Sequence, residues 1–243
     1  MCGIAGFVDK TIKNKKKVIK DMAERIKYRG PDGEGYFIDD EVALAHRRLA
    51  IIDLSSGGQP QYNEDNSLVI VFNGEIYNFV ELKEELIKAG HKFRNKSDTE
   101  VIIHGYEEWG TEVTKHLRGM FAFAIWDTRQ KTLFIARDGF GIKPLYYAKF
   151  GSSFMFASEI KAFLDHPKFK KELNKEILSS YLCFNSTPTE ETFFKGVYRV
   201  EPGYQLLYKN GKINKTQFFK LEFAETNEDM DTIVKRIRTA MES

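Results

Sequence analysis

Four apolar runs lie close together in residues 119–158, GMFAFAIWDTRQKTLFIARDGFGIKPLYYAKFGSSFMFAS. Each run is rich in β-branched and aromatic residues and is bounded by turn-forming residues, which is typical of a strand. The strands follow one another directly instead of alternating with helices. This order favours antiparallel sheets with helices packed outside them, in an α+β layered domain.

More strands are expected on both sides of this stretch. Apolar runs bounded by turn residues predict strands at 2–9, 36–39, 42–54, 67–78 and 204–213. Within the last of these, Asn210-Gly211 predicts a two-residue hairpin turn.

Helices are expected between the groups of strands. Val18, Met22 and Ile26 share one helical face, and the helix ends at the Gly and Pro residues of 29–35. In 79–90, three residues are expected to face inward and Gly90 to end the helix. These inward residues are Leu82, Leu86 and Ile87.

Three further helical segments complete the pattern. Ser97 and Glu100 have the spacing of a capping box at the start of a helix. Residues 159–166 predict a short helix, and 173–184 predict another. The second is expected to pack through Ile177, Leu178, Tyr181 and Leu182.

The composition changes near residue 221. Residues 221–243 are charged, lack Gly and Pro, and place apolar residues at helical spacing. The apolar positions are Met230, Ile233, Val234, Ile237 and Met241. They predict a linker and one helix, which either packs against a partner outside this sequence or docks back onto the main domain.

Composition narrows the class of protein. The chain has 243 residues, 42% of them hydrophobic and 30% charged, so a folded core is expected rather than disorder. The formal net charge is +2, with acidic and basic residues interleaved, so neither nucleic acid nor a membrane is the expected partner. No membrane span or signal peptide is predicted.

The Cys and His content also limits the chemistry. Two cysteines, Cys2 and Cys183, are too few for a disulfide framework and favour a cytoplasmic location. The five histidines are scattered without metal-ligand spacing, so no metal site is expected.

The N-terminus, MCGIAGF, raises a question about Cys2. Methionine ahead of a small residue is usually trimmed, which would leave Cys2 with a thiol and a free α-amino group. Such a residue combines a nucleophile with a base. The alternative is a small apolar residue at the start of a buried strand. On these seven residues alone, the packed cysteine is favoured.

Several polar motifs shift that balance. In order they are MCGIAGF, RGPDG, HRRLAIIDLSSGGQP, NGEIYN, SDTEVI, GMFAFAIWD, RDGFGIKPLYY, FASEIKA and EPGY. Taken singly, several could be plain turns. Together, from Cys2 to about residue 220, they resemble the glutaminase domain of glutamine-hydrolysing asparagine synthetases. Those domains are class II glutamine amidotransferases, within the N-terminal nucleophile hydrolases. The resemblance implies a four-layer αββα sandwich of two antiparallel sheets.

The resemblance also implies a catalytic centre. Cys2 would be the nucleophile and its own amine the base, so no catalytic histidine is needed. The pKa of a free thiol is about 8.5 and that of an α-amino group about 7.7–8.0, so this proton transfer is feasible. The Asn73 side chain and the Gly74 N–H match the oxyanion hole. Cys183 matches nothing catalytic and is expected to be a packed thiol.

Further residues match the family's substrate-binding and supporting positions. Arg48 matches the arginine that binds the substrate α-carboxylate. Arg47, the next residue on the same strand, would point to the opposite face. The other matching residues are Glu75 and Asp98 for the α-ammonium, Leu49, Ile51 and Ile52 along the pocket, and Arg29, Asp32 and Asn78 in support.

The chain also departs from the family pattern. Full-length relatives carry a synthetase domain that binds ATP on an SGGxDS loop, whereas Gln59 and Pro60 follow Gly57-Gly58 here. Residues 1–220 would form the glutaminase domain, and 221–243 a linker and the first helix of a truncated synthetase domain. ATP and Mg are expected only for the absent domain, and no cofactor for the glutaminase reaction. L-glutamine and that synthetase domain are the expected partners, and a homodimer stays open.

Three hypotheses follow. The chain supplies ammonia for asparagine synthesis, or it supplies ammonia for another acceptor such as a cell-wall peptide or a surface sugar, or it is a non-catalytic remnant. Intact Cys2, Arg48, Asn73, Glu75 and Asp98 argue against the third. Asparagine synthesis is favoured over other acceptors, which the residues themselves do not exclude.

Overall fold

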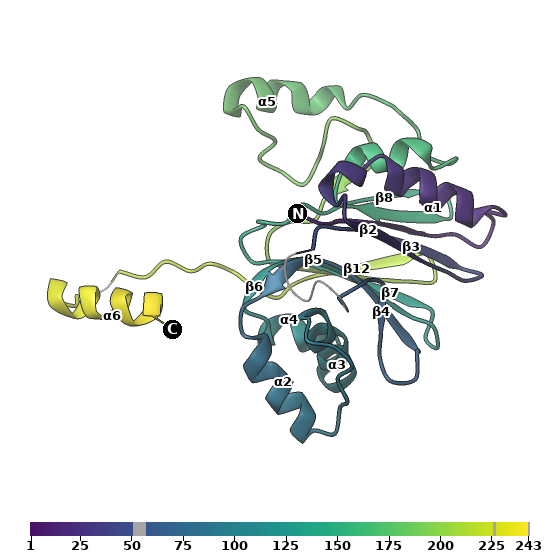
Figure 1. Cartoon of the computed structure of the whole chain (residues 1–243). Coiled ribbons are helices and arrows are strands. Elements are labelled where there is room, and N and C mark those ends of the chain that lie inside the picture. Colours follow the sequence, from purple (N-terminus) through teal and green to yellow (C-terminus); the bar gives the residue numbers. More distant parts are fainter. Residues whose placement is uncertain (51–56, 226, 243) are drawn as a thin grey trace.

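The computed structural model describes residues 1–50, 57–225 and 227–242. It contains two antiparallel six-stranded sheets, stacked face to face between helices (Figure 1). The first sheet has the strand order β10-β8-β9-β1-β3-β2 and the second β12-β11-β7-β6-β5-β4. The first is built from β1 (Gly3–Val8), β2 (Gly33–Ile38), β3 (Val42–Arg48), β8 (Tyr146–Phe150), β9 (Ser153–Ala157) and β10 (Val197–Arg199). The second is built from β4 (Gln61–Tyr62), β5 (Leu68–Ile76), β6 (Gly119–Asp127), β7 (Thr132–Arg137), β11 (Tyr204–Lys209) and β12 (Lys212–Gln217).

Helices cover the outer faces of the two sheets. α1 lies over the first sheet, and α2, α3 and α4 lie over the second (Figure 1). The α-helices are α1 (Lys15–Glu24), α2 (Phe79–Lys88), α3 (Thr99–Trp109), α4 (Val113–His116), α5 (Leu178–Phe184) and α6 (Met230–Glu242). The 3-10 helices are η1 (Lys27–Arg29), η2 (Gly110–Glu112), η3 (Ile160–Asp165) and η4 (Lys175–Ile177).

The alternation of side chains along the central strands explains the layers. In β6, Ala122 and Trp126 join the core between the sheets, whereas Phe123 and Ile125 join the core under α2 and α3. Because successive residues of a strand point to opposite faces, a strand that is apolar at every position is buried on both sides. All residues from 121 to 127 are buried. The predicted αββα sandwich is thereby confirmed.

Most predicted elements are present, and the hairpin at residues 204–213 forms as expected. Asn210 has φ of 50° and Gly211 of 77°, and Lys209 pairs with Lys212 across the turn. Two positive φ angles in succession are the geometry that Asn-Gly favours in a two-residue hairpin. Gly90, with φ of 107°, ends the predicted helix after α2.

Three expectations about packing were wrong. Ile87 is 51% exposed on α2, whereas Leu82 and Leu86 of that helix are buried in the core and Phe79 packs against it. Residues 173–184 begin as the 3-10 helix η4 and only then become α5, whose Leu182 is 82% exposed. Cys183 is exposed rather than packed. In this segment Asn174 and Ile177 are buried, whereas none of the residues of the short helix α5 is buried.

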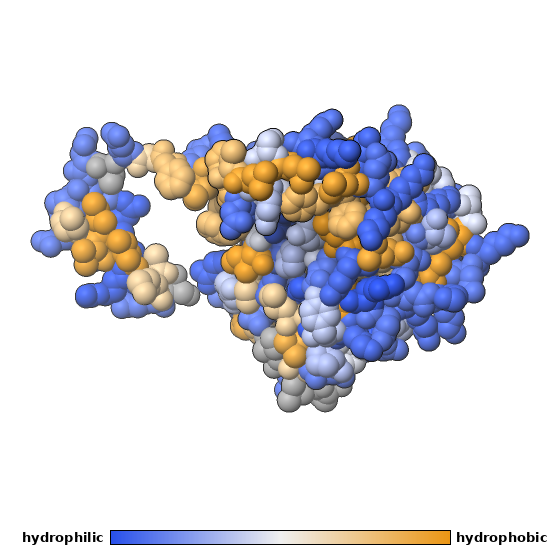
Figure 2. Space-filling model, turned by 90° about the horizontal axis from the view of Figure 1, so that it is seen from above, coloured by the Kyte–Doolittle hydropathy of each residue, from blue (hydrophilic) through white to orange (hydrophobic). Residues whose placement is uncertain are grey.

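The C-terminal helix forms as predicted and stands away from the sandwich (Figure 1). None of its residues is buried, and Met230 and Met241 are 71% and 83% exposed. Apolar side chains gather on its surface (Figure 2). The helix therefore does not dock back onto the main domain. None of the helices among the described residues is long and apolar enough to cross a membrane.

Candidate active site

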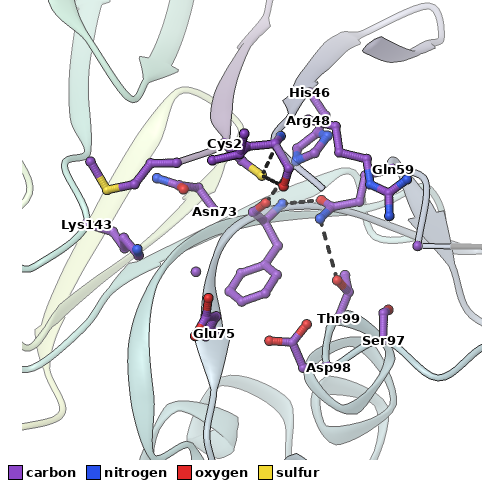
Figure 3. A pocket seen from close by; sticks show the side chains of 15 residues that line it. Cys2, His46, Arg48, Gln59, Asn73, Glu75, Ser97, Asp98, Thr99 and Lys143 are labelled. Atoms are coloured by element: carbon purple, nitrogen blue, oxygen red, sulfur yellow. Dashed lines mark hydrogen bonds between the residues drawn. The ribbon is translucent and has the colours of Figure 1, made fainter. Parts of the chain in front are cut away.

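A pocket opens where the start of β1, the end of β3, the middle of β5 and the start of α3 meet (Figure 3). Most of its lining residues have polar or charged side chains, and they include most of the residues that the motifs singled out. The lining residues are Met1, Cys2, His46, Arg48, Leu49, Gly57, Gln59, Phe72, Asn73, Gly74, Glu75, Ser97, Asp98, Thr99 and Lys143.

Hydrogen bonds to its backbone carbonyl and to its thiol hold Cys2 in place. The Arg29 Nε donates to the Cys2 carbonyl at 3.0 Å, and the Arg29 guanidinium is itself paired with Glu159 at 2.8 Å. The Leu49 N–H donates to the Cys2 Sγ at 3.3 Å. Burial raises the pKa of the thiol, while this N–H and the charges of the N-terminus, Arg48 and Lys143 act to lower it. The α-amino group of Cys2 itself would lower the pKa of the thiol most directly, but it is bound in the peptide bond to Met1.

Asn73 and Gly74 lie in the middle of β5, opposite Ala122 and Phe121 of β6. The pair is therefore part of the sheet and not a hairpin turn. Asn73 is 1% exposed, and among the described residues its Nδ2 has no hydrogen-bond partner. A buried amide without a partner is costly, so this Nδ2 is available to a bound ligand, an ion or a water molecule. A Cβ on Gly74 would lie 2.3 Å from the Met120 carbonyl oxygen, so only glycine fits there.

The two arginines of β3 point to opposite faces, as predicted. Arg48 lines the pocket. Arg47 instead forms ion pairs with Glu34 at 2.5 Å and with Glu24 at 2.8 Å, outside the pocket. The assignment of Arg48 rather than Arg47 to the pocket agrees with this geometry.

Two carboxylates face the pocket from different elements. Glu75 follows Gly74 on β5, and Asp98 immediately precedes α3 (Figure 3). Asp98 is 5% exposed and accepts a hydrogen bond from the Ile76 N–H at 2.8 Å. Burial raises the pKa of Asp98 to about 6, and the Glu75 charge adds to the rise. The pocket therefore has an arginine on one side and a pair of carboxylates on the other.

The capping box predicted at Ser97 does not form. Asp98 occupies the cap position, without a side-chain cap bond, and the Ser97 hydroxyl bonds with the Gln61 amide. Glu100 accepts from the backbone N–H groups of Arg94 and Asn95 instead of reaching back to Ser97. The N-cap of the helix is therefore residue 98, one position later than the spacing of Ser97 and Glu100 predicts. Asp98 nevertheless remains available to a ligand.

The supporting residues fall into three groups. Arg29 holds Cys2, and Asp32 accepts from the Ala50 N–H at 2.9 Å, so both order the pocket rim. Asn78, matched to a supporting position, bonds with the backbone of His116 and Arg118 at 2.9 Å and does not line the pocket. Ile51 and Ile52 lie outside the described residues.

Sequence reasoning missed several lining residues, and three of them make contacts that suggest a role. Gln59 accepts from the Phe72 N–H at 2.6 Å and thereby contacts β5 beside Asn73. The His46 ring bonds with the Phe72 carbonyl at 3.1 Å, and burial lowers its pKa to about 3, so it is a neutral structural group.

Lys143 is the third missed residue, although it lies within the motif RDGFGIKPLYY. It is 6% exposed, and its positive charge lowers the pKa of the Cys2 thiol. Its backbone is fixed by Asp138, which accepts from the Lys143 N–H at 3.0 Å, and by Arg137, which donates to its carbonyl at 2.7 Å. The motif could have suggested a rigid loop, but not that the loop ends beside Cys2.

The sequence profile of the family described as "Glutamine amidotransferase domain" matches residues 1–219. The chain belongs to this family. The resemblance seen in the motifs is therefore confirmed, and the pocket around Cys2 lies within this amidotransferase domain.

Curated relatives of the amidotransferase domain are asparagine synthetases of the glutamine-hydrolysing type. Asparagine synthetase 1 of Bacillus subtilis is 42% identical over 99% of this chain and 39% of its own length. Asparagine synthetase 3 of the same organism is 38% identical over 98% of this chain and 40% of its own length. Asparagine synthetase 3 of Arabidopsis thaliana is 47% identical over 68% of this chain and 29% of its own length. The chain thus spans well under half the length of these relatives.

Solved structures support the fold. The glutamine phosphoribosylpyrophosphate amidotransferase of Bacillus subtilis superposes with a TM-score of 0.67 at 20% identity, over 90% of this chain and 49% of that one. The structure titled as the allosteric regulatory enzyme of purine biosynthesis gives 0.66 at 21% identity, over 90% of this chain and 49% of that one. At this identity the likeness concerns the amidotransferase fold alone.

Proposed function

We propose that the chain hydrolyses L-glutamine to glutamate and ammonia through a thioester on Cys2. The observation that carries the proposal is that the Cys2 thiol and the unpartnered Nδ2 of buried Asn73 line one pocket. A thiol beside an unused hydrogen-bond donor is the arrangement that acyl transfer requires. Family membership supports the same reaction.

The reaction begins with proton transfer. After removal of Met1, the α-amino group of Cys2 takes the thiol proton, directly or through water, and the sulfur attacks the side-chain amide carbon of glutamine. Negative charge develops on the amide oxygen, where the Asn73 Nδ2 and the Gly74 N–H stabilise it. The amine then protonates the departing nitrogen, which leaves as ammonia. Water cleaves the thioester, releasing glutamate and restoring the thiol.

Substrate selection would depend on Arg48, Glu75 and Asp98, which together form what we term the zwitterion clamp. The arginine would bind the α-carboxylate of glutamine and the two acids its α-ammonium. Because the carboxylates are fixed on β5 and at the start of α3, they also set the distance from the ammonium to Cys2. The side chain of asparagine is shorter and would not bring its amide carbon to the sulfur.

N-acetylglutamine tests the clamp and the proposed reaction together. We expect its kcat/KM to be lower than that of glutamine by about 10- to 150-fold or more, because a charge-assisted hydrogen bond contributes ~1.5–3 kcal/mol. The measurement is steady-state ammonia release from both substrates and from glutamine amide. Equal hydrolysis of glutamine and N-acetylglutamine would remove the clamp from the proposal, and no ammonia from glutamine would remove the reaction.

The raised pKa of Asp98, about 6, predicts how glutamine binding depends on pH. Below that pH the carboxyl is protonated and no longer attracts the ammonium, so affinity should fall by up to about tenfold per pH unit. Calorimetric titration of glutamine into the Cys2→Ala variant measures this without turnover. Asp98→Asn should bind weakly at every pH, whereas Asp65→Asn, on an exposed turn, should behave as its parent. A parent affinity that stays constant from pH 7 to pH 4 would contradict the assignment.

The ammonia is proposed to serve asparagine synthesis, as the names of the curated relatives suggest. In this proposal residues 1–220 form the glutaminase domain, and 221–243 lead into a synthetase domain that uses ATP and Mg in the cytoplasm. The exposed apolar side chains of α6 support a packing partner of that kind. Product analysis of the full-length gene product, supplied with glutamine, ATP and aspartate, tests it. Formation of glutamate without asparagine would indicate that the ammonia acceptor is not aspartate.

A further inference from the structure

Two histidines and two glutamates meet outside the active-site pocket. Glu64 lies in the turn between β4 and β5, His91 follows α2, and His104 and Glu107 lie one turn apart on α3. One ligand atom from each of the four lies within 4.8 Å of all the others. We propose that this His2Glu2 cluster binds a divalent transition-metal ion, with zinc as the best fit, as a structural site. Zinc takes imidazole and carboxylate ligands together.

Four of the separations between the ligand groups lie close to those of a tetrahedral site. The His104 Nδ1 lies 3.3 Å from a Glu64 oxygen and 3.1 Å from the Glu107 Oε2. The His91 Nδ1 lies 3.4 Å from the other Glu64 oxygen and 3.7 Å from the Glu107 Oε2. Ligands at about 2.0–2.1 Å from a tetrahedral ion are separated from one another by about 3.3–3.4 Å. The separations of 3.3 and 3.4 Å equal this spacing, whereas the 3.1 Å contact between His104 and Glu107 is a hydrogen bond.

Neighbouring groups orient the carboxylates. The Asn63 Nδ2 donates to the Glu107 Oε1 at 2.8 Å, which leaves the Oε2 facing the two histidines. The Lys92 N–H donates to the Glu64 Oε1 at 3.0 Å. Second contacts of this kind are typical around metal ligands, because they fix the orientation of each group.

The charge and burial of the His2Glu2 cluster also favour a bound cation. Within the described ranges, the ion-pair partners found for Glu64 and Glu107 are the two histidines alone. His104 is 1% exposed and its ring packs edge-on against Phe93 at 4.7 Å. A third carboxylate, Glu108, lies 3.5 Å from the His91 Nε2, and a divalent ion would balance the carboxylate charge gathered around the two imidazoles.

The position of the cluster indicates a structural role. A bound ion would fasten the segment after α2 and the middle of α3 to the β4–β5 turn. The start of α3 carries Asp98 and Thr99, which line the active-site pocket. The cluster itself contributes no residue to that pocket. It would stabilise the wall of the pocket and would not take part in the reaction.

Metal content and spectroscopy test the proposal. The untagged chain is stripped with a chelator, and Zn²⁺ and Co²⁺ are titrated separately after the chelator is removed. We expect one ion per chain and, with Co²⁺, the intense visible absorption of a tetrahedral site. His91→Ala and Glu64→Gln each remove one ligand from a partly exposed position and should weaken binding by at least about tenfold. His116→Ala, an exposed histidine at the end of α4, is the matched control and should bind as the parent does.

Two further variants separate the outcomes. Cys2→Ala should keep full binding, which distinguishes the cluster from a metal held by the active-site thiol. Circular dichroism of each variant without metal establishes that it is folded. The proposal is overturned if the folded parent binds no stoichiometric Zn²⁺ or Co²⁺, in which case the four residues form a hydrogen-bonded ion-pair network. It is equally overturned if folded His91→Ala and Glu64→Gln both bind as tightly as the His116→Ala control, or if Cys2→Ala abolishes binding.

Discussion

Replacing Cys2 with alanine is expected to abolish ammonia release from glutamine, with a loss on the order of 10³-fold or more. The thiol is the nucleophile of the proposed reaction, and Cys2 is the only cysteine among the described residues that line the pocket. Cys183→Ala should leave activity nearly intact, because Cys183 is exposed on α5, outside the pocket. Ammonia release from the two purified variants is the measurement, and comparable losses in both would show that the site is misassigned.

The free amine of Cys2 has its own test. Met1 is 52% exposed at the pocket, so it is accessible to an aminopeptidase. Intact-mass spectrometry of active protein should show a chain that begins at Cys2. An active preparation that keeps Met1 throughout would exclude the α-amino group as the base, even if Cys2→Ala is inactive.

Replacing Asn73 with alanine should lower kcat by about 10²- to 10³-fold, because one oxyanion donor contributes ~2.7–4 kcal/mol to the barrier. The effect on KM should be small, since the donor meets negative charge that exists only in the transition state. Asn214→Ala, on exposed β12, is the matched control and should leave both constants unchanged. A KM effect without a kcat effect would place Asn73 in ground-state binding instead. Gly74 offers no comparable test, because its added Cβ would lie 2.3 Å from the Met120 carbonyl oxygen.

Most of the secondary structure could be predicted from local sequence patterns. The alternation in β6 places Ala122 and Trp126 on one face and Phe123 on the other, and this pattern reads directly from the sequence. Asn210-Gly211 specifies its own turn because both residues tolerate positive φ. The predictions for Ile87 and Leu182 were wrong because helical spacing predicts an apolar face that is wider than the part of the helix in contact with the rest of the domain.

The pocket itself was only partly predictable. Resemblance to the family named Cys2, Asn73 and Asp98 before any geometry was known, and all three line one pocket. The capping box predicted at Ser97 does not form, because the spacing expresses only a local preference. The Gln61 side chain from β4 forms a hydrogen bond with the Ser97 hydroxyl instead. Lys143 was missed because its motif describes a tight loop and contains no information on what the loop faces.

The sequence by itself determined most strands and helices and the family, and it singled out Cys2 as the candidate nucleophile, because each depends on neighbouring residues or on ordered motifs. Only the tertiary structure decided which distant residues meet. Stacking β3 against β5 brings Arg48 near Glu75, and packing α3 over β5 supplies Asp98 and raises its pKa through burial. The same packing joins His91 and His104 into one cluster, although their spacing along the chain suggested no metal site. Proximity of this kind arises when sheets and helices bury their apolar faces, and no local pattern records it.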